Sequence, residues 1–207
     1  MNLLRMIRHW QARRRLRDPA FAFLFDTPPE NEWISIDFET SSLDPKSAEI
    51  ISIAAVPVCG HRILRSHALR LILKPSRSLP AESIRIHQLR QQDLADGMSV
   101  DEALSILLNF IGPRPLLGYY LEFDLFILNR EIRPRLGIDL PNLAIEVSGL
   151  YYDYKVSAYR PEVDLRLTSI LQDLELPDLP RHDPLNDAIL AAMVFLKLHT
   201  PKAQNHR

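Results

Sequence analysis

Cysteine, net charge and long apolar runs are all scarce in this chain of 207 residues. Its single cysteine, Cys59, excludes an internal disulfide and a cysteine-based metal cluster, and it fits a reducing compartment. The formal net charge of −1 at pH 7 excludes a basic protein that coats nucleic acid without specificity. The apolar run near the N-terminus is too short and too interrupted for a signal peptide or a membrane span. We therefore expect a cytoplasmic protein that does not contact a membrane.

The rest of the composition is that of one globular domain with a short basic segment in front. Hydrophobic residues make up 46% and charged residues 25% of the chain, which is ordinary for a folded domain. Residues 1–26 combine arginines with an apolar stripe and predict a basic amphipathic helix. This helix either packs on the domain with its arginines in solvent or forms an arm that contacts nucleic acid or a partner. A proline-rich connector then predicts a domain over residues 27–200 and a short tail over 201–207.

The order of the expected strands and helices indicates an α/β fold. Three strands in quick succession suggest an antiparallel meander, after which helices and strands alternate. The expected strands cover residues 33–40, 50–58, 61–73, 115–120 and 143–147. The expected helices cover residues 99–111, 124–135, 165–174 and 183–198, and a loop with a short helical piece covers 79–87. This order predicts a mixed sheet, with an antiparallel meander and parallel strands, flanked by helices.

Two carboxylates lie on one face of the first expected strand. Asp37 and Glu39 alternate with Ile36 and Phe38 at the strand period, so their side chains project in the same direction. Like charges at this spacing disfavour joint ionisation unless a cation lies between them. The pattern predicts a site for hard divalent cations, whose other ligands must come from elsewhere in the chain.

Two further acids and one histidine are candidates to complete this site. Asp124 follows the expected strand 115–120, at a place where α/β proteins present ligand groups, and Asp187 lies one turn into the last expected helix. Taken singly, Asp187 is better explained as a complement to the helix dipole and Asp124 as a helix cap. His182 lies in a proline-rich loop before that helix. A lone histidine is more often structural, but an imidazole beside a metal site can accept a proton at neutral pH.

Taken together, Asp37, Glu39, Asp124, His182 and Asp187 resemble the motifs of the DEDD superfamily of 3′–5′ exonucleases. The interval from His182 to Asp187 is similar to that of the histidine subclass, which includes the proofreading subunit of bacterial replicative polymerase, RNase T and oligoribonuclease. The resemblance implies a ribonuclease H-like fold, two Mg²⁺ (or Mn²⁺) ions held by the four acids, and His182 as the general base. Oxygen ligands suit these ions, and two of them can stabilise the attacking and leaving oxygens of a phosphodiester.

Five residues are candidates for substrate binding: Thr40, Ser41, His87, Tyr120 and Phe123. In the family resemblance, His87 belongs to a segment that lines the pocket for the terminal nucleotide, and Thr40 and Ser41 approach the 3′ terminus. Tyr120 and Phe123 are aromatic residues that can stack on a base, although strand periodicity explains Phe123 equally well as core.

The chain departs from the family pattern at three positions that border the expected pocket. Ser42 stands where glycine is usual, and Tyr119 and Tyr120 replace a histidine-asparagine pair. These departures affect which substrate the pocket would accept. The four acids and His182, which would carry out the reaction, all match the family pattern.

The leading hypothesis is a 3′–5′ exonuclease that releases nucleoside monophosphates from single-stranded DNA. One alternative is an exoribonuclease that trims RNA, and another is a proofreading subunit docked to a DNA polymerase. The replicative proofreading subunit uses a C-terminal extension for docking, and this sequence ends at Arg207, so we expect the N-terminal helix to dock instead. A non-catalytic nucleic-acid binder is disfavoured by the intact acids.

Overall fold

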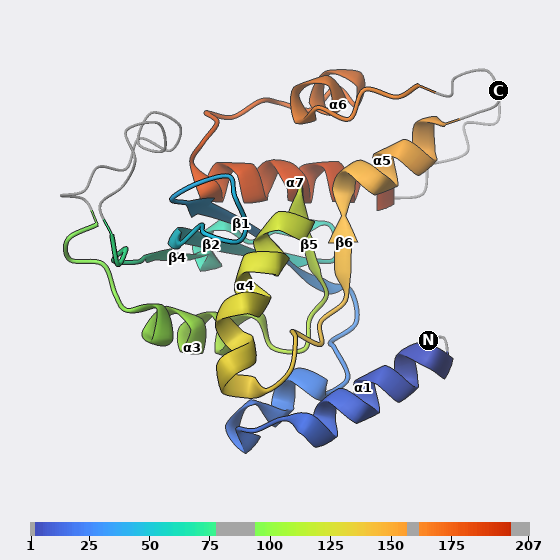
Figure 1. Ribbon diagram of the computed structural model, residues 1–207. Coiled ribbons are helices and arrows are strands. Elements are labelled where there is room, and N and C mark those ends of the chain that lie inside the picture. The colour runs from blue at the N-terminus through green and yellow to red at the C-terminus, as the bar shows by residue number, and fades with distance from the viewer. Residues whose placement is uncertain (1–2, 78–93, 157–161, 200–207) are drawn as a thin grey trace.

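The structure is a computed structural model that describes residues 3–77, 94–156 and 162–199. Its centre is a mixed sheet in the strand order β3-β2-β1-β5-β6, with β4 also pairing with β2 (Figure 1). The strands are β1 (Glu32–Thr40), β2 (Ile50–Cys59), β3 (Arg62–Ile63), β4 (Leu69–Ile72), β5 (Leu116–Gly118) and β6 (Ala144–Glu146). β1 pairs antiparallel with β2 and parallel with β5. The predicted mixed sheet is therefore confirmed.

Helices cover both faces of this sheet (Figure 1). They are α1 (Leu3–Arg15), α3 (Val100–Ile111), α4 (Leu121–Leu136), α5 (Val147–Lys155), α6 (Leu167–Asp173) and α7 (Pro184–His199), with short 3-10 helices η1 (Pro19–Phe25) and η2 (Arg65–His67). α3 and α4 pack on one face, and α5, α6 and α7 pack on the other. Ser99 caps α3 by accepting a hydrogen bond from the N–H of Glu102, as its sequence predicts. Among the described residues, no helix has the length and apolar character that crossing a bilayer requires.

The expected third strand over residues 61–73 is not continuous, and this expectation was wrong. The chain forms β3, turns through η2 and then forms β4, and both short strands pair with β2. The break faces Pro57 of β2, whose carbonyl accepts a hydrogen bond from the N–H of Leu64. Proline has no N–H to return, so the ladder is interrupted at this point.

Besides η2, two helical segments differ from the sequence-based expectation: α5 was not expected, and η1 is separate from α1, although one helix was expected over residues 1–26. α5 follows β6 directly, and the Glu146 side chain caps it by accepting from the N–H of Ser148. η1 begins at Pro19, where Asp18 accepts from the N–H of Ala20. Both segments are short and depend on packing against the domain, so their periodicity is weak. The expected helical piece over 79–87 and the tail over 201–207 lie outside the described residues.

The segment before β1 joins the core of the domain. Leu24 and Phe25 of η1 are buried against α3 and α4, and the N–H of Arg17 donates to the carbonyl of Leu136. α1 packs Ala12 against the same core. The domain boundary at residue 27 stays a prediction, but the residues just before it contribute to the packing that follows it.

Both faces of β1 are buried, and they differ in chemistry. Ile34, Ile36 and Phe38 face α3 and α4 within the larger apolar cluster. On the other face the hydroxyl of Ser35 is fully buried and donates to the carbonyl of Ala188 in α7, at 2.7 Å. This bond fixes α7 along the polar face of β1, which also carries Asp37 and Glu39.

Replacement of Ser35 by alanine tests how much that bond contributes. We expect Ser35→Ala to lower the free energy of unfolding by about 1 kcal/mol, because a buried hydrogen bond between β1 and α7 is lost. Chemical denaturation of the two proteins measures the difference. Ser105→Ala is the matched control: it removes an exposed serine bond within α3, and we expect a change of less than about 0.5 kcal/mol. Equal effects of the two substitutions would contradict the role given to Ser35.

Candidate active site

Asp37 and Glu39 lie on the polar face of β1, near the C-terminal end of this central strand. Their neighbours on the same face are Ser35 and, across the ladder, Ala54 of β2, which is opposite Asp37. Ala54 packs against Leu185 and Ala188 of α7, so the small side chains let the helix approach this face closely. Both carboxylates are partly buried between the strand and the start of α7.

Asp124 enters the site from the first turn of α4 and is only 5% exposed. α4 was expected to begin at Asp124, but it begins at Leu121. The earlier start is due to Glu146 at the end of β6, whose carboxylate accepts hydrogen bonds from the N–H groups of Tyr120 and Leu121 at 3.2 and 2.7 Å. A carboxylate at this position satisfies donors that a helix N-terminus leaves unpaired.

Asp187 lies in the first turn of α7, as the sequence predicts, and it is linked to the loop before the helix. Its Oδ2 accepts a hydrogen bond from the N–H of His182 at 3.0 Å, and its Oδ1 lies 2.9 Å from Nε of Arg181. One possible ligand atom each of Glu39, His182 and Asp187 lie within 4.8 Å of one another. The loop thus brings the predicted histidine to the predicted acids.

The four carboxylates disfavour one another's ionisation. Burial raises the pKa of Asp37 well above its ordinary value, and the charges of the other three acids raise it further. Burial also raises the pKa of Asp124, although a hydrogen bond from the backbone of Phe38 lowers it in part. For Asp187, burial raises the pKa and the charge of Arg181 opposes the shift.

Glu39 is the acid whose shift falls at neutral pH. Burial raises the pKa of Glu39 from 4.5 to about 7, and the charges of Asp187 and Asp183 add to the effect. Buried acids that lie together and hold protons near neutral pH favour a cation in place of those protons. Four carboxylates offer oxygen ligands of the kind that Mg²⁺ and Mn²⁺ prefer, so the residues present fit these ions.

Of the predicted substrate residues, Thr40 and Ser41 follow Glu39 in the chain, and Phe123 precedes Asp124. The hydroxyl of Thr40 donates to the carbonyl of Ser42, and that of Ser41 accepts from the N–H of Glu49, so both secure the turn after β1. Tyr120 is 73% exposed. His87 lies outside the described residues.

Phe123 packs in the core, which is one of the two roles that its sequence left open, and its stacking on a base stays a prediction. It packs against the main core from its partly buried position, and it lines a cavity of about 460 Å³ together with Tyr120 and Phe126. Phe126 is 50% exposed and was not predicted, nor was Glu146, which lines the same cavity. Glu146 could have been identified from the sequence, because α/β proteins present ligand groups where parallel strands end, and the same argument identified Asp124.

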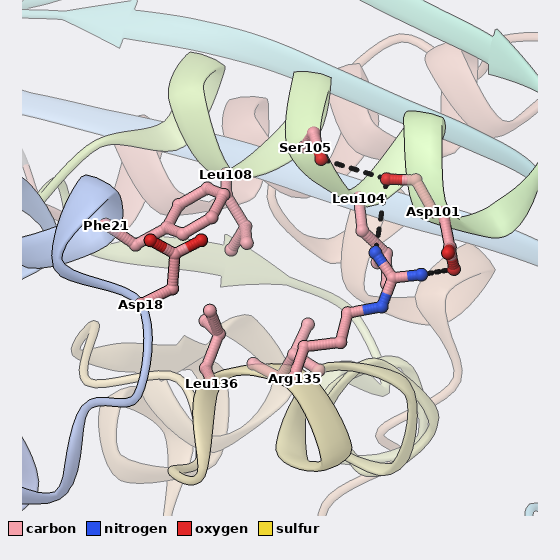
Figure 2. A pocket seen from close by; sticks show the side chains of 9 residues that line it. Asp18, Phe21, Asp101, Leu104, Ser105, Leu108, Arg135 and Leu136 are labelled. Carbon is pink, nitrogen blue, oxygen red and sulfur yellow. Dashed lines mark hydrogen bonds and ion pairs between the residues drawn. The ribbon is translucent and has the colours of Figure 1, made fainter.

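A second cavity, of about 310 Å³, lies at the opposite end of α4 and does not extend the site. It is bounded by α3, the end of α4 and the segment before η1 (Figure 2). Arg135 reaches across it to Asp101, with which it forms an ion pair (Figure 2). The carboxylate of Asp18 caps η1 by accepting from the N–H of Ala20. Its charged groups therefore have partners, and leucines make up much of the remaining wall.

Comparison with known proteins places this geometry in a family. The family model RNase_T, described as an exonuclease, matches residues 34–195, from β1 to α7. The chain belongs to this exonuclease family. The matched range begins three residues before Asp37 and ends after Asp187, so the RNase_T match includes all five predicted residues of the chemistry.

Bacterial polymerases contain the most informative relatives. The PolC-type DNA polymerase III of Thermotoga maritima is 30% identical over 166 residues, which cover 80% of this chain and 12% of that polymerase. DNA polymerase III subunit epsilon of Rickettsia conorii is 27% identical over 170 residues, which cover 80% of this chain and 72% of the subunit. The chain therefore spans a small part of the PolC-type relatives.

Solved exonuclease structures have the same fold. Exonuclease I of E. coli, in complex with a dA16 oligonucleotide, superposes with a TM-score of 0.68 at 16% identity, over 84% of this chain and 42% of that one. Exonuclease X, in complex with 5′ overhanging duplex DNA, gives 0.63 at 19% identity, over 80% of this chain and 90% of that one. The predicted ribonuclease H-like fold and the predicted exonuclease family are confirmed.

The raised pKa of Glu39 leads to a prediction about pH and metal. The folded protein holds this proton more tightly than the unfolded chain, so without metal the stabilisation is complete below pH 4.5 and is lost as the pH rises through about 7. Mn²⁺ at a hundred times its dissociation constant should then stabilise by about 2.7 kcal/mol at pH 8, or roughly 5 to 10 °C in Tm. At about pH 5.5 the protonated acids should make the effect much smaller.

Calorimetry with and without chelator measures both effects. Glu39→Gln should remove most of the pH dependence and most of the response to Mn²⁺. Glu30→Gln, at an exposed position before β1, is the matched control and should retain both. A response to Mn²⁺ that is equal at the two pH values, or equal in Glu39→Gln, would count against the assignment of Glu39.

Proposed function

We propose that this chain is a metal-dependent 3′–5′ exonuclease that hydrolyses terminal phosphodiester bonds of single-stranded DNA and releases nucleoside monophosphates. The proposal rests on one observation: four acids and one histidine lie close together near the C-terminal end of β1. They are Asp37, Glu39, Asp124, Asp187 and His182. Membership of an exonuclease family supports the reaction class.

The four acids would hold two Mg²⁺ or Mn²⁺ ions. Asp37 and Asp124 are the inner pair, from β1 and α4, and Glu39 and Asp187 are the pair nearer to solvent. When bound, such ions stabilise the charge on both the attacking and the leaving oxygens of the phosphodiester. The rigid strand and the two helix starts keep the carboxylates in place without a change in the fold.

His182 is the residue proposed to accept the proton of the attacking water. Its side chain is exposed, and its possible ligand atom is close to those of Glu39 and Asp187, so it can face both the acids and solvent. An imidazole titrates near neutral pH and suits this role.

The aromatic cavity beside Asp124 would receive the bases of the substrate. Tyr120, Phe123 and Phe126 line it, and aromatic rings stack on any unpaired base, which suits an enzyme that removes nucleotides in sequence. Thr40, Ser41 and His87 remain the proposed contacts to the terminal nucleotide. The location proposed for this activity is the cytoplasm, supported by the single cysteine.

Single-stranded oligonucleotides test the reaction. With Mg²⁺, a 5′-labelled DNA strand should give a ladder of products shortened one nucleotide at a time, and a 3′-labelled strand should lose its label in the first step. Chelator should stop both reactions. Stepwise shortening from the 5′ end, or no shortening, would contradict the proposal, and faster shortening of RNA of equal sequence would assign the activity to RNA trimming.

Two variants separate the roles within the site in this assay. His182→Ala should lower turnover by roughly 10²- to 10⁴-fold while Mn²⁺ still binds, because the proton acceptor is lost. Asp124→Asn should weaken Mn²⁺ binding itself, because a ligand is lost. Arg133→Ala, which removes an exposed ion pair at the far end of α4, is the control and should retain full turnover.

We also propose that α1 docks the enzyme to a DNA polymerase. The support is that Met6, Ile7 and Trp10 of α1 are 48%, 43% and 57% exposed, and that relatives of this chain are subunits or parts of DNA polymerase III. The combined substitution Ile7→Ser and Trp10→Ser should weaken binding to the purified polymerase of the same source at least tenfold, as measured by calorimetry. Ile106→Ser, at an exposed apolar residue of α3, should not. Unchanged binding in the double variant would exclude this surface.

A further inference from the structure

His182 is held in a backbone conformation that needs support. Its φ is +63°, in the left-handed region that residues other than glycine adopt rarely. It is exposed and lies in the loop between α6 and α7, where packing alone restrains a side chain weakly. A proton acceptor on such a loop functions only if something fixes the loop relative to the acids.

One support comes from the adjacent residue, Asp183, which is tied to the sheet. Nη2 of Arg70 in β4 donates to both carboxylate oxygens of Asp183, at 2.8 and 3.0 Å. The same carboxylate caps α7 by accepting from the N–H groups of Leu185 and Asn186. Asp183 therefore connects the start of α7 to β4 immediately after His182.

The position of Arg70 in the sheet makes this connection specific. Arg70 is opposite Ala54 of β2, and Ala54 is opposite Asp37 of β1. Residues in one cross-strand row project from the same face, so Arg70 lies in the row of the metal-binding acid. Leu69 and Leu71, its neighbours on β4, pack into the core on the other face.

We infer that Arg70 is a positioning residue: through Asp183 it fixes His182 relative to the row of the sheet that carries Asp37. This inference rests on the proposed function, because it gives Arg70 a role in proton transfer. The bond from the N–H of His182 to Asp187 holds the loop from one side, and the pair of Arg70 and Asp183 holds it from the other. Arg70 itself does not touch the reacting atoms.

Turnover measurements on variants at both ends of the pair test this role. Arg70→Ala should lower kcat about fivefold and leave KM unchanged, since an exposed ion pair contributes at most about that factor. Asp183→Asn retains a good helix cap and should have the same effect. Arg133→Ala, which breaks the exposed pair with Asp139, is the matched control and should leave kcat unchanged.

A double-mutant cycle shows whether Arg70 acts through His182. In the His182→Ala background, Arg70→Ala should cause no further fall in kcat, because the residue that it positions is gone. An equal fivefold fall in both backgrounds would overturn the inference. So would a raised KM with unchanged kcat, which would identify Arg70 as a direct contact to a substrate phosphate.

Hydrogen exchange tests the same inference without activity. The amide of His182 should exchange roughly tenfold faster in Arg70→Ala, because the loop opens more often, and at the wild-type rate in Arg133→Ala. Unchanged protection in Arg70→Ala would overturn the inference even if the enzyme is active. If the wild-type protein shortens no oligonucleotide, the proposed function fails, and hydrogen exchange still decides whether Arg70 holds the loop.

Discussion

Burial of four carboxylates in one place is the constraint on which this site depends. Burial is the largest cause that raises the pKa of Asp37, Glu39, Asp124 and Asp187, and the charges of the other three acids raise that of Asp37 further. Arg181 and two backbone hydrogen bonds, from Phe38 to Asp124 and from His182 to Asp187, compensate only part of this cost. The apolar packing on both faces of the sheet keeps the acids together although their ionisation there is unfavourable.

β1 contributes to both the hydrophobic core and the candidate site, because alternate side chains of a strand point to opposite faces of the sheet. One of its faces is apolar and joins the main core, whereas the other has Ser35, Asp37 and Glu39 in succession. A helix can cover that polar face only if the face offers it a hydrogen bond and little bulk, and Ser35 and Ala54 provide both. The bond that attaches α7 therefore also holds Asp187 of that helix beside the acids of β1.

Sequence reasoning found the features that are local and missed those that depend on partners. The alternation in β1, the cap at Ser99 and the interval from His182 to Asp187 are readable from neighbouring residues, and all lie where they were expected. The start of α4 was misplaced because a carboxylate twenty-five residues further along the chain caps it. The break in the third strand follows from Pro57, whose missing donor matters only once the direction of pairing is known. No sequence motif identifies Arg70, because its partner Asp183 is distant in sequence.

The short strand β4 joins two properties that are usually treated separately. Leu71 is 4% exposed and anchors the strand in the core, and Leu69 packs beside it, so the register of β4 is set by burial of leucine. Because side chains alternate, that register also decides to which face Arg70 points. With Arg70 in the role inferred above, a shift of one residue would leave the hydrogen-bonded ladder possible but turn the guanidinium away from the loop. Packing of the two leucines in the hydrophobic core would thus also fix the position of the proposed catalytic base, His182.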